Sequence, residues 1–135
     1  MDTYQARLAP PLTESLPSLL IVDDDADLRE SIESAVPEGT CRIFHAQDGV
    51  VALERLRTPP PVDLVLLDLR MPRMNGLELL AALSADPTLP RLPIWLMSHE
   101  GDLACRTSAY PIAGILDKPL RLQTLLAVLA TLPRG

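Results

Sequence analysis

Short apolar runs alternate with amphipathic stretches along most of the chain. The runs lie at Leu19–Val22, Arg42–Ala46, Leu64–Leu67, Ile94–Met97 and Gly114–Leu116. A short run that is apolar on both faces is typical of a strand covered by helices on each side of its sheet. The alternation therefore predicts repeated strand–helix units on a parallel sheet of five strands.

Helical periodicity fills the intervals between these runs. Within Asp27–Val36, Leu28 and Ile32 share one helical face, and Pro37 follows directly. Further helices are predicted at Val50–Leu56, Leu77–Leu83 and Leu122–Leu132. The stretch Gly101–Tyr110 has room for about two turns before a proline, which predicts a short fourth helix. The predicted fold is a doubly wound α/β sheet with five helices, which binds ligands at the carboxyl ends of its strands.

The first 17 residues have no hydrophobic period and contain three prolines. We expect a disordered tail there and a single domain over residues 18–135. The tail lacks the basic and apolar regions of a secretory signal, and no apolar run reaches the roughly 18–20 residues of a membrane helix. We therefore expect a cytoplasmic protein without a membrane partner. The last predicted helix ends three residues before the end of the sequence, so we expect no output domain.

Composition narrows the range of partners. The net charge is −6, and the chain has no basic run interleaved with aromatic residues. This argues against direct binding of nucleic acid, which needs phosphate neutralisation and base stacking. Cys41 and Cys105 lie far apart in apolar surroundings, which favours buried free thiols over a metal site or a disulfide.

Polar residues follow four of the five predicted strands. They are Asp23, Asp24 and Asp25 after the first strand, Asp68 after the third, Ser98 after the fourth and Lys118 after the fifth. Because parallel strands place their carboxyl ends on one edge, these residues would converge in one crevice. Purely structural roles stay open for these residues. The aspartates could cap a helix, which we expect for Asp25 in any case, and Asp68 could be a turn residue. The Ser98 hydroxyl could bind the backbone.

The residue types point to phosphoryl chemistry. Clustered carboxylates repel one another unless a cation lies among them, and a few hard oxygen ligands suit Mg²⁺. Lys118 is the single lysine beside eleven arginines, and a compact ammonium can contact one oxygen as a point charge. An accident of composition is the alternative for this lysine. Asp117 should point to the opposite face of the strand, leaving the ammonium free to reach Asp68, which would then suit the role of a phosphoryl acceptor.

Four motifs in order resemble the receiver domain of bacterial response regulators. They are Leu20–Asp25, Asp63–Gly76, Ser98 and Lys118-Pro119. The resemblance covers about residues 18–132 and implies a flavodoxin-like receiver with strand order 2-1-3-4-5.

The resemblance also implies a metal site. Asp24 and Asp68 would ligate Mg²⁺ directly together with the backbone carbonyl of Arg70, and Asp23 would act mostly through water. Asp68 would accept the phosphoryl group from a histidine kinase or histidine phosphotransfer protein.

Two further positions complete the implied site. Ser98 and Lys118 would bind the phosphoryl oxygens, and the peptide bond between Lys118 and Pro119 would be cis. Phosphorylation would switch the affinity for a downstream effector protein, and a homodimer is a further expectation.

The chain departs from the family at several positions. His99 replaces the small residue usual beside the phosphoryl pocket and would obstruct access, unless it swings into solvent. Arg70 and Glu100 occupy the positions that tune the lifetime of the phosphoryl group, and their charges would pair across the crevice. Ile115 stands where the family often has a switching aromatic residue, which puts the usual route of signal output in doubt.

Three functions compete. The first is a phosphoacceptor switch that is not a turnover enzyme. The second is a degenerate receiver that serves as a binding or dimerisation module independently of phosphorylation. The third is a metal-dependent phosphatase or hydrolase, which usually carries an acid/base aspartate two residues after its nucleophile; that position holds Arg70.

Overall fold

A five-stranded parallel sheet forms the centre of the protein. The computed structural model describes residues 16–89, 91–99 and 111–133. The strands are β1 (Ser18–Val22), β2 (Arg42–Ala46), β3 (Leu64–Asp68), β4 (Ile94–Ser98) and β5 (Gly114–Asp117). They are hydrogen-bonded in the order β2-β1-β3-β4-β5, and every neighbouring pair is parallel. The predicted sheet and its strand order are confirmed.

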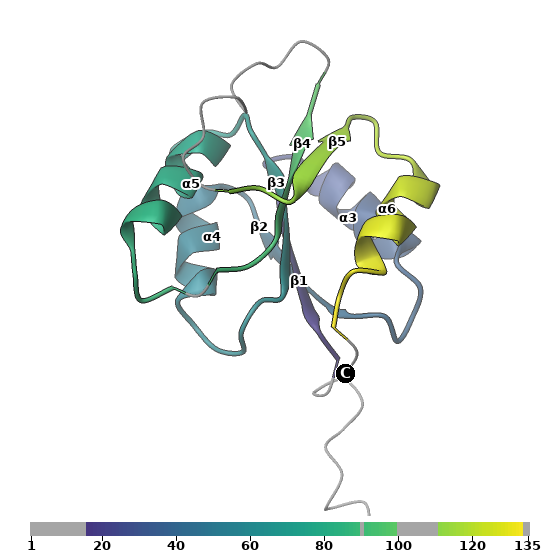
Figure 1. Cartoon of the computed structure of the whole chain (residues 1–135). Helices are drawn as coiled ribbons and strands as arrows, with labels where there is room; N and C mark the ends of the chain where they lie inside the picture. Colours follow the sequence, from purple (N-terminus) through teal and green to yellow (C-terminus); the bar gives the residue numbers. More distant parts are fainter. Residues whose placement is uncertain (1–15, 90, 100–110, 134–135) are drawn as a thin grey trace, which may run out of the picture.

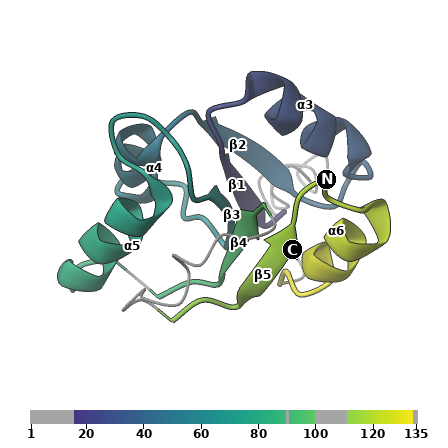
Figure 2. The same ribbon diagram turned by 90° about the horizontal axis from the view of Figure 1, so that it is seen from above.

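Helices cover both faces of this sheet. They are α3 (Ala26–Ala35), α4 (Gly49–Leu56), α5 (Gly76–Ala85) and α6 (Leu122–Leu129). Helices α4 and α5 lie on one face, and α3 and α6 lie on the other (Figure 1), an arrangement that is also visible from above (Figure 2). The described residues thus hold four of the five expected helices, while the stretch predicted to form the short fourth one lies outside them. None of the helices in the described ranges is long and apolar enough to cross a membrane.

The two faces bury separate aliphatic clusters. Along β1, Leu20 and Val22 pack with the α4–α5 layer, whereas Leu19 and Ile21 pack with the α3–α6 layer. This alternation follows from the two-residue period of a strand. β1 and β3 are buried along their whole length, and the edge strands β2 and β5 are only partly buried. The ends of the central strands β1 and β3 therefore lie between two packed layers of helices.

Helix ends differ slightly from those that the sequence predicts. Helix α3 ends at Ala35, because Val36 precedes a proline and adopts an extended conformation with ψ 124°. Helix α6 ends at Leu129, three residues early, where the Thr131 hydroxyl donates a hydrogen bond to the Val128 carbonyl. Both differences concern the last turn of a helix and leave the predicted layers unchanged.

Cys41 lies next to the start of β2 as a partly buried free thiol. Burial raises its pKa to about 11, so it stays protonated near neutral pH. The prediction for Cys105 lies outside the described residues.

Candidate functional site

Three carboxylates meet at the carboxyl ends of β1 and β3. Val22 pairs with Leu67 across these strands, which brings the next residues, Asp23 and Asp68, side by side. Oxygen atoms of Asp23, Asp24 and Asp68 all lie within 4.8 Å of one another. Asp23 is fully buried and Asp68 nearly so, whereas Asp24 is exposed. The cluster is thus open to solvent on the Asp24 side.

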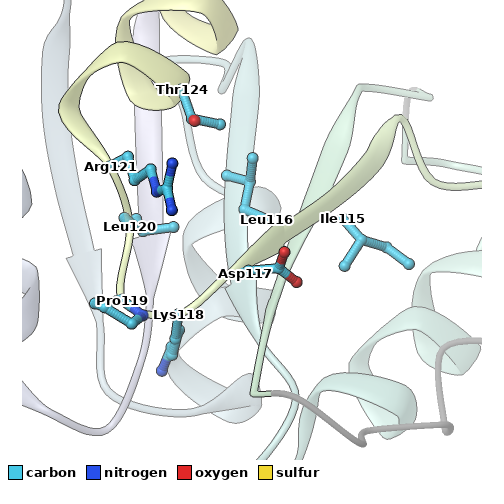
Figure 3. A pocket seen from close by; sticks show the side chains of 8 residues that line it. All are labelled: Ile115, Leu116, Asp117, Lys118, Pro119, Leu120, Arg121 and Thr124. Carbon is cyan, nitrogen blue, oxygen red and sulfur yellow. The ribbon is translucent and has the colours of Figure 1, made fainter.

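The ammonium of Lys118 lies between two of these carboxylates. Its Nζ donates to Asp23 Oδ2 at 2.7 Å and to Asp68 Oδ1 at 3.2 Å. The backbone N–H of Lys118 donates to the Ser98 carbonyl at 2.8 Å, which aligns the end of β5 with the end of β4. The Asp117 and Lys118 side chains leave the chain in different directions (Figure 3). The peptide bond between Lys118 and Pro119 is cis.

The aspartates after β1 have different hydrogen-bond partners. Asp23 Oδ1 accepts the backbone N–H of Asp25 at 2.9 Å, and its other oxygen binds Lys118. Asp25 caps α3 by accepting the N–H groups of Asp27 and Leu28, as the capping pattern predicts. Both Asp23 oxygens are thus engaged within the protein, whereas the exposed Asp24 is well placed to bind an added cation.

Charge in the cluster is unbalanced, since three carboxylates share one ammonium. Burial raises the pKa of Asp68, and the neighbouring Asp23 raises it further, against the lowering effect of Lys118 and of a hydrogen bond from the Arg70 N–H. For Lys118, burial lowers the pKa, but Asp23 and Asp68 outweigh this and the net shift is upward. The lysine therefore stays charged while the carboxylates still repel one another.

The donor set fits a hard divalent cation. Among the residues that the structure describes, the cluster consists of the carboxylate oxygens of Asp23, Asp24 and Asp68, with no sulfur or imidazole donor. Mg²⁺ prefers a few carboxylate ligands and retains several waters, and the exposed Asp24 side leaves room for water. A cation there would also relieve the repulsion that raises the pKa of Asp68.

The remaining predicted site residues surround this cluster. Ser98 is buried at the end of β4, next to β3 in the sheet. Arg70 has an exposed side chain, and its backbone N–H binds the Asp68 carboxylate. His99 is exposed. Glu100, and with it the expected pair with Arg70, lies outside the described residues.

Comparisons with known proteins agree with this geometry. The response regulator receiver domain model matches residues 19–130. The chain belongs to the response regulator receiver family. The response regulator MprA of Mycobacterium sp. (strain KMS) is 35% identical over 118 residues, which are 86% of this chain and 50% of MprA. MprA of Mycobacterium ulcerans (strain Agy99) is 34% identical over the same shares.

Solved receivers share the fold. The chemotaxis response regulator CheY4 of Vibrio cholerae superposes with a TM-score of 0.74 at 26% identity, covering 85% of this receiver and 97% of CheY4. The phosphorylated cyanobacterial phytochrome response regulator RcpA gives a TM-score of 0.70 at 25% identity, covering 84% and 89%. This receiver spans about half the length of the curated relatives that it matches.

The edge strand of this receiver presents an apolar side chain to solvent. Ile115, at the position where an aromatic switch is common, is 46% exposed. It lines a hollow of about 580 Å³ that runs along the end of β5 and the start of α6 (Figure 3). Lys118 lines the same hollow and binds two of the clustered carboxylates, so it connects the hollow to the cluster.

The sequence did not reveal one buried carboxylate near the site. Asp48 is 1% exposed and binds Arg73, which lies in the loop that follows Asp68. An Asp-Gly pair before an apolar helical period is a recognisable helix start, so Asp48 could have been identified as the cap of α4. No sequence pattern pairs it with an arginine 25 positions later.

Proposed function

We propose that this receiver accepts a phosphoryl group on Asp68 in a Mg²⁺-dependent reaction, and that phosphorylation changes its affinity for a partner protein. The donor is a histidine kinase or a histidine phosphotransfer protein. The observation that carries the proposal is the Lys118 ammonium, which binds Asp23 and Asp68 beside the exposed Asp24. That RcpA, a relative of the same fold, is described as phosphorylated supports it.

Asp68 is suited to act as the nucleophile. One of its carboxylate oxygens would form a bond to phosphorus while the bond between phosphorus and the donor's nitrogen or oxygen breaks. Burial and the Asp23 charge raise its pKa, which makes the ionised carboxylate a better nucleophile than that of an exposed aspartate. The product is an acyl phosphate, and no net oxidation or reduction takes place.

Asp24, Asp68 and the backbone carbonyl of Arg70 would hold Mg²⁺, with Asp23 acting through water. When bound, Mg²⁺ supplies positive charge that offsets the charge on the phosphoryl oxygens. Lys118 would remain hydrogen-bonded to Asp23 while its ammonium moves from Asp68 Oδ1 to a phosphoryl oxygen. Ser98 would donate its hydroxyl proton to a second phosphoryl oxygen.

Side chains at the entrance would tune the lifetime of the acyl phosphate. His99 and Arg70 are exposed near the ends of β4 and β3, and we place Glu100 with them in this role. Replacing His99 or Arg70 with alanine should change the rate at which water removes the phosphoryl group. Unchanged lifetimes in both variants would contradict this role.

The test is incubation with acetyl phosphate and Mg²⁺, followed by the mass of the intact protein. Wild type should gain one phosphoryl group, and Asp68→Asn should gain none. Asp63→Asn, directly before the first residue of the same strand, is the matched control and should behave like wild type. A wild type that gains no mass would favour the alternative of a binding module independent of phosphorylation, and steady hydrolysis of an external phosphoester that depends on Asp68 would favour a hydrolase.

A further inference from the structure

The loop between β3 and α5, residues 69–75, is fastened to the start of α4 by an ion pair. Arg73 Nε donates to Asp48 Oδ2 at 2.6 Å, and Arg73 Nη2 binds the same oxygen. The Asp48 side chain is 2% exposed, whereas that of Arg73 is 55% exposed. The guanidinium therefore reaches from the surface to a carboxylate that is otherwise shielded from water.

Arg73 adopts an unfavourable backbone conformation, and its side chain has the donors that this contact uses. Among the described residues, Arg73 is the one non-glycine residue with a positive φ, at 64°. This left-handed conformation costs roughly 1 kcal/mol or more for a residue with a side chain, whereas glycine adopts it freely. The planar guanidinium offers several donors in one rigid fork, and here two of its nitrogens bind one carboxylate oxygen.

A second contact joins the same two segments. The Gly49 N–H donates to the Met74 carbonyl at 2.9 Å. A Cβ added to Gly49 would lie 2.6 Å from the Met74 side chain and 2.8 Å from the Met74 carbonyl oxygen, so this approach requires glycine. Asp48 also caps α4 by accepting the Val51 N–H at 3.0 Å. The start of α4 and the far end of the loop thus form one unit.

The near end of the loop is joined to the phosphoacceptor. The Arg70 N–H binds the Asp68 carboxylate, and the Gly76 N–H donates to the Leu69 carbonyl at 3.0 Å. A Cβ added to Gly76 would lie 2.6 Å from the Asp68 carbonyl oxygen. Because both ends of the loop are fixed in this way, we expect a displacement at Arg73 to reach Arg70 and Asp68.

We infer that Arg73 and Asp48 are positioning residues for the acceptor site, because their ion pair holds the loop so that the Arg70 backbone stays in place beside Asp68. The inference rests on the proposed function, since it concerns the Mg²⁺ and phosphoryl chemistry of the same site. A role confined to stability is the competing explanation. The two differ in what happens to Mg²⁺ affinity in a variant that is still folded.

Mg²⁺ binding to the purified full chain, measured by titration calorimetry well below the unfolding temperature, tests this. Loss of a partner that orients metal ligands typically weakens binding by about 10- to 100-fold, and we expect Arg73→Gln to weaken it by at least about tenfold. Arg73→Gly should lose a similar amount, although glycine suits the backbone. Arg57→Gln, which removes an exposed arginine that binds Asp86 at 3.3 Å, is the matched control and should leave the affinity unchanged.

Hydrogen exchange at the Gly49 and Gly76 amides separates this inference from the proposed function. Both amides donate to loop carbonyls and should exchange faster in Arg73→Gln than in wild type. Unchanged exchange, or Mg²⁺ affinity within about twofold of wild type in both Arg73 variants, would overturn the inference even if wild type is phosphorylated. A wild type that binds no Mg²⁺ and accepts no phosphoryl group would instead overturn the proposed function, and the exchange rates would still decide whether the pair holds the loop.

Discussion

Asp68 and Asp48 are two buried carboxylates that lie in opposite electrostatic situations. Their residues are 5% and 1% exposed, and each binds one cationic side chain. Burial raises the pKa of Asp68, with Asp23 adding to the effect, and the net shift is upward. Burial also raises the pKa of Asp48, but hydrogen bonds from the Val51 N–H and from Arg73 outweigh it, and the net shift is downward. Burial acts in the same direction on both carboxylates, so the neighbouring groups account for the opposite net shifts.

The difference separates a structural carboxylate from the one that we propose to be reactive. Asp48 has an arginine to itself and a backbone donor from α4. Asp68 shares its lysine with Asp23 and lies beside Asp24 as well. A site with excess negative charge binds a cation and an electrophile favourably, whereas a satisfied carboxylate has no such tendency.

The largest effect on stability should come from Asp48→Ala. This change removes the cap of α4 and the partner of Arg73, and we expect a loss of about 2–3 kcal/mol in the free energy of unfolding. Urea denaturation measures it. A loss below about 0.5 kcal/mol, the size of an ordinary surface substitution, would mean that its neighbours stabilise the Asp48 carboxylate no more than those of Asp68 do.

Lys118→Gln should have the next largest effect. In Mg²⁺-free buffer the two nearly buried carboxylates would lose their cation, at a cost of about 2 kcal/mol. Because an ion that binds only the folded state stabilises it, adding Mg²⁺ should raise the melting temperature of Lys118→Gln more than that of wild type. An equal rise in both proteins would show that the ammonium and the metal ion do not offset the same charge.

Asp68→Asn should stabilise the Mg²⁺-free protein, by roughly 1 kcal/mol, at the small end of single-substitution effects. The substitution removes one of three clustered carboxylates, and Lys118 keeps its shorter bond to Asp23. Asp48→Asn should destabilise the protein under the same conditions. Denaturant unfolding of both variants in EDTA measures the two changes in the free energy of unfolding. Changes of the same sign would contradict the prediction.

The pH dependence of these two variants should also differ. The folded pKa of Asp48 lies below the ordinary value of 3.8, so its stabilising effect is present above that value and is lost as the pH falls through the folded pKa. The folded pKa of Asp68 lies above 3.8, so the penalty of its ionised form disappears as the pH falls through that higher value. The gain from Asp68→Asn should therefore vanish at a higher pH than the loss from Asp48→Asn. Unfolding free energies measured in EDTA from about pH 7 to about pH 3 would show this order, and the reverse order would contradict it.

The sequence predicted the sheet well because its pattern is local. β2 was predicted with its observed bounds, and β1 and β3 differ from prediction by one residue at one end. Each strand is a short apolar run flanked by polar residues. Helix ends were less predictable, since the last turn of α6 depends on the Thr131 hydroxyl bonding to Val128 rather than on hydrophobic period.

The part of the candidate site that follows from parallel topology was predictable. That topology brings Asp23, Asp24, Asp68 and Lys118 together without any knowledge of side-chain geometry. It did not show that Lys118 lies closer to Asp23 than to Asp68, because the difference depends on how each side chain leaves its strand. The pairing of Asp48 with a loop residue was likewise beyond a periodicity argument.

The most direct test of the central claim locates the phosphoryl group on the chain. After exposure to acetyl phosphate, reduction with borohydride converts a phosphorylated aspartate to homoserine, and peptide mass spectrometry identifies its position. We predict homoserine at position 68, dependent on Mg²⁺, with Asp24 and Asp48 unchanged. Homoserine at either of those positions, or at position 68 without Mg²⁺, would contradict the account.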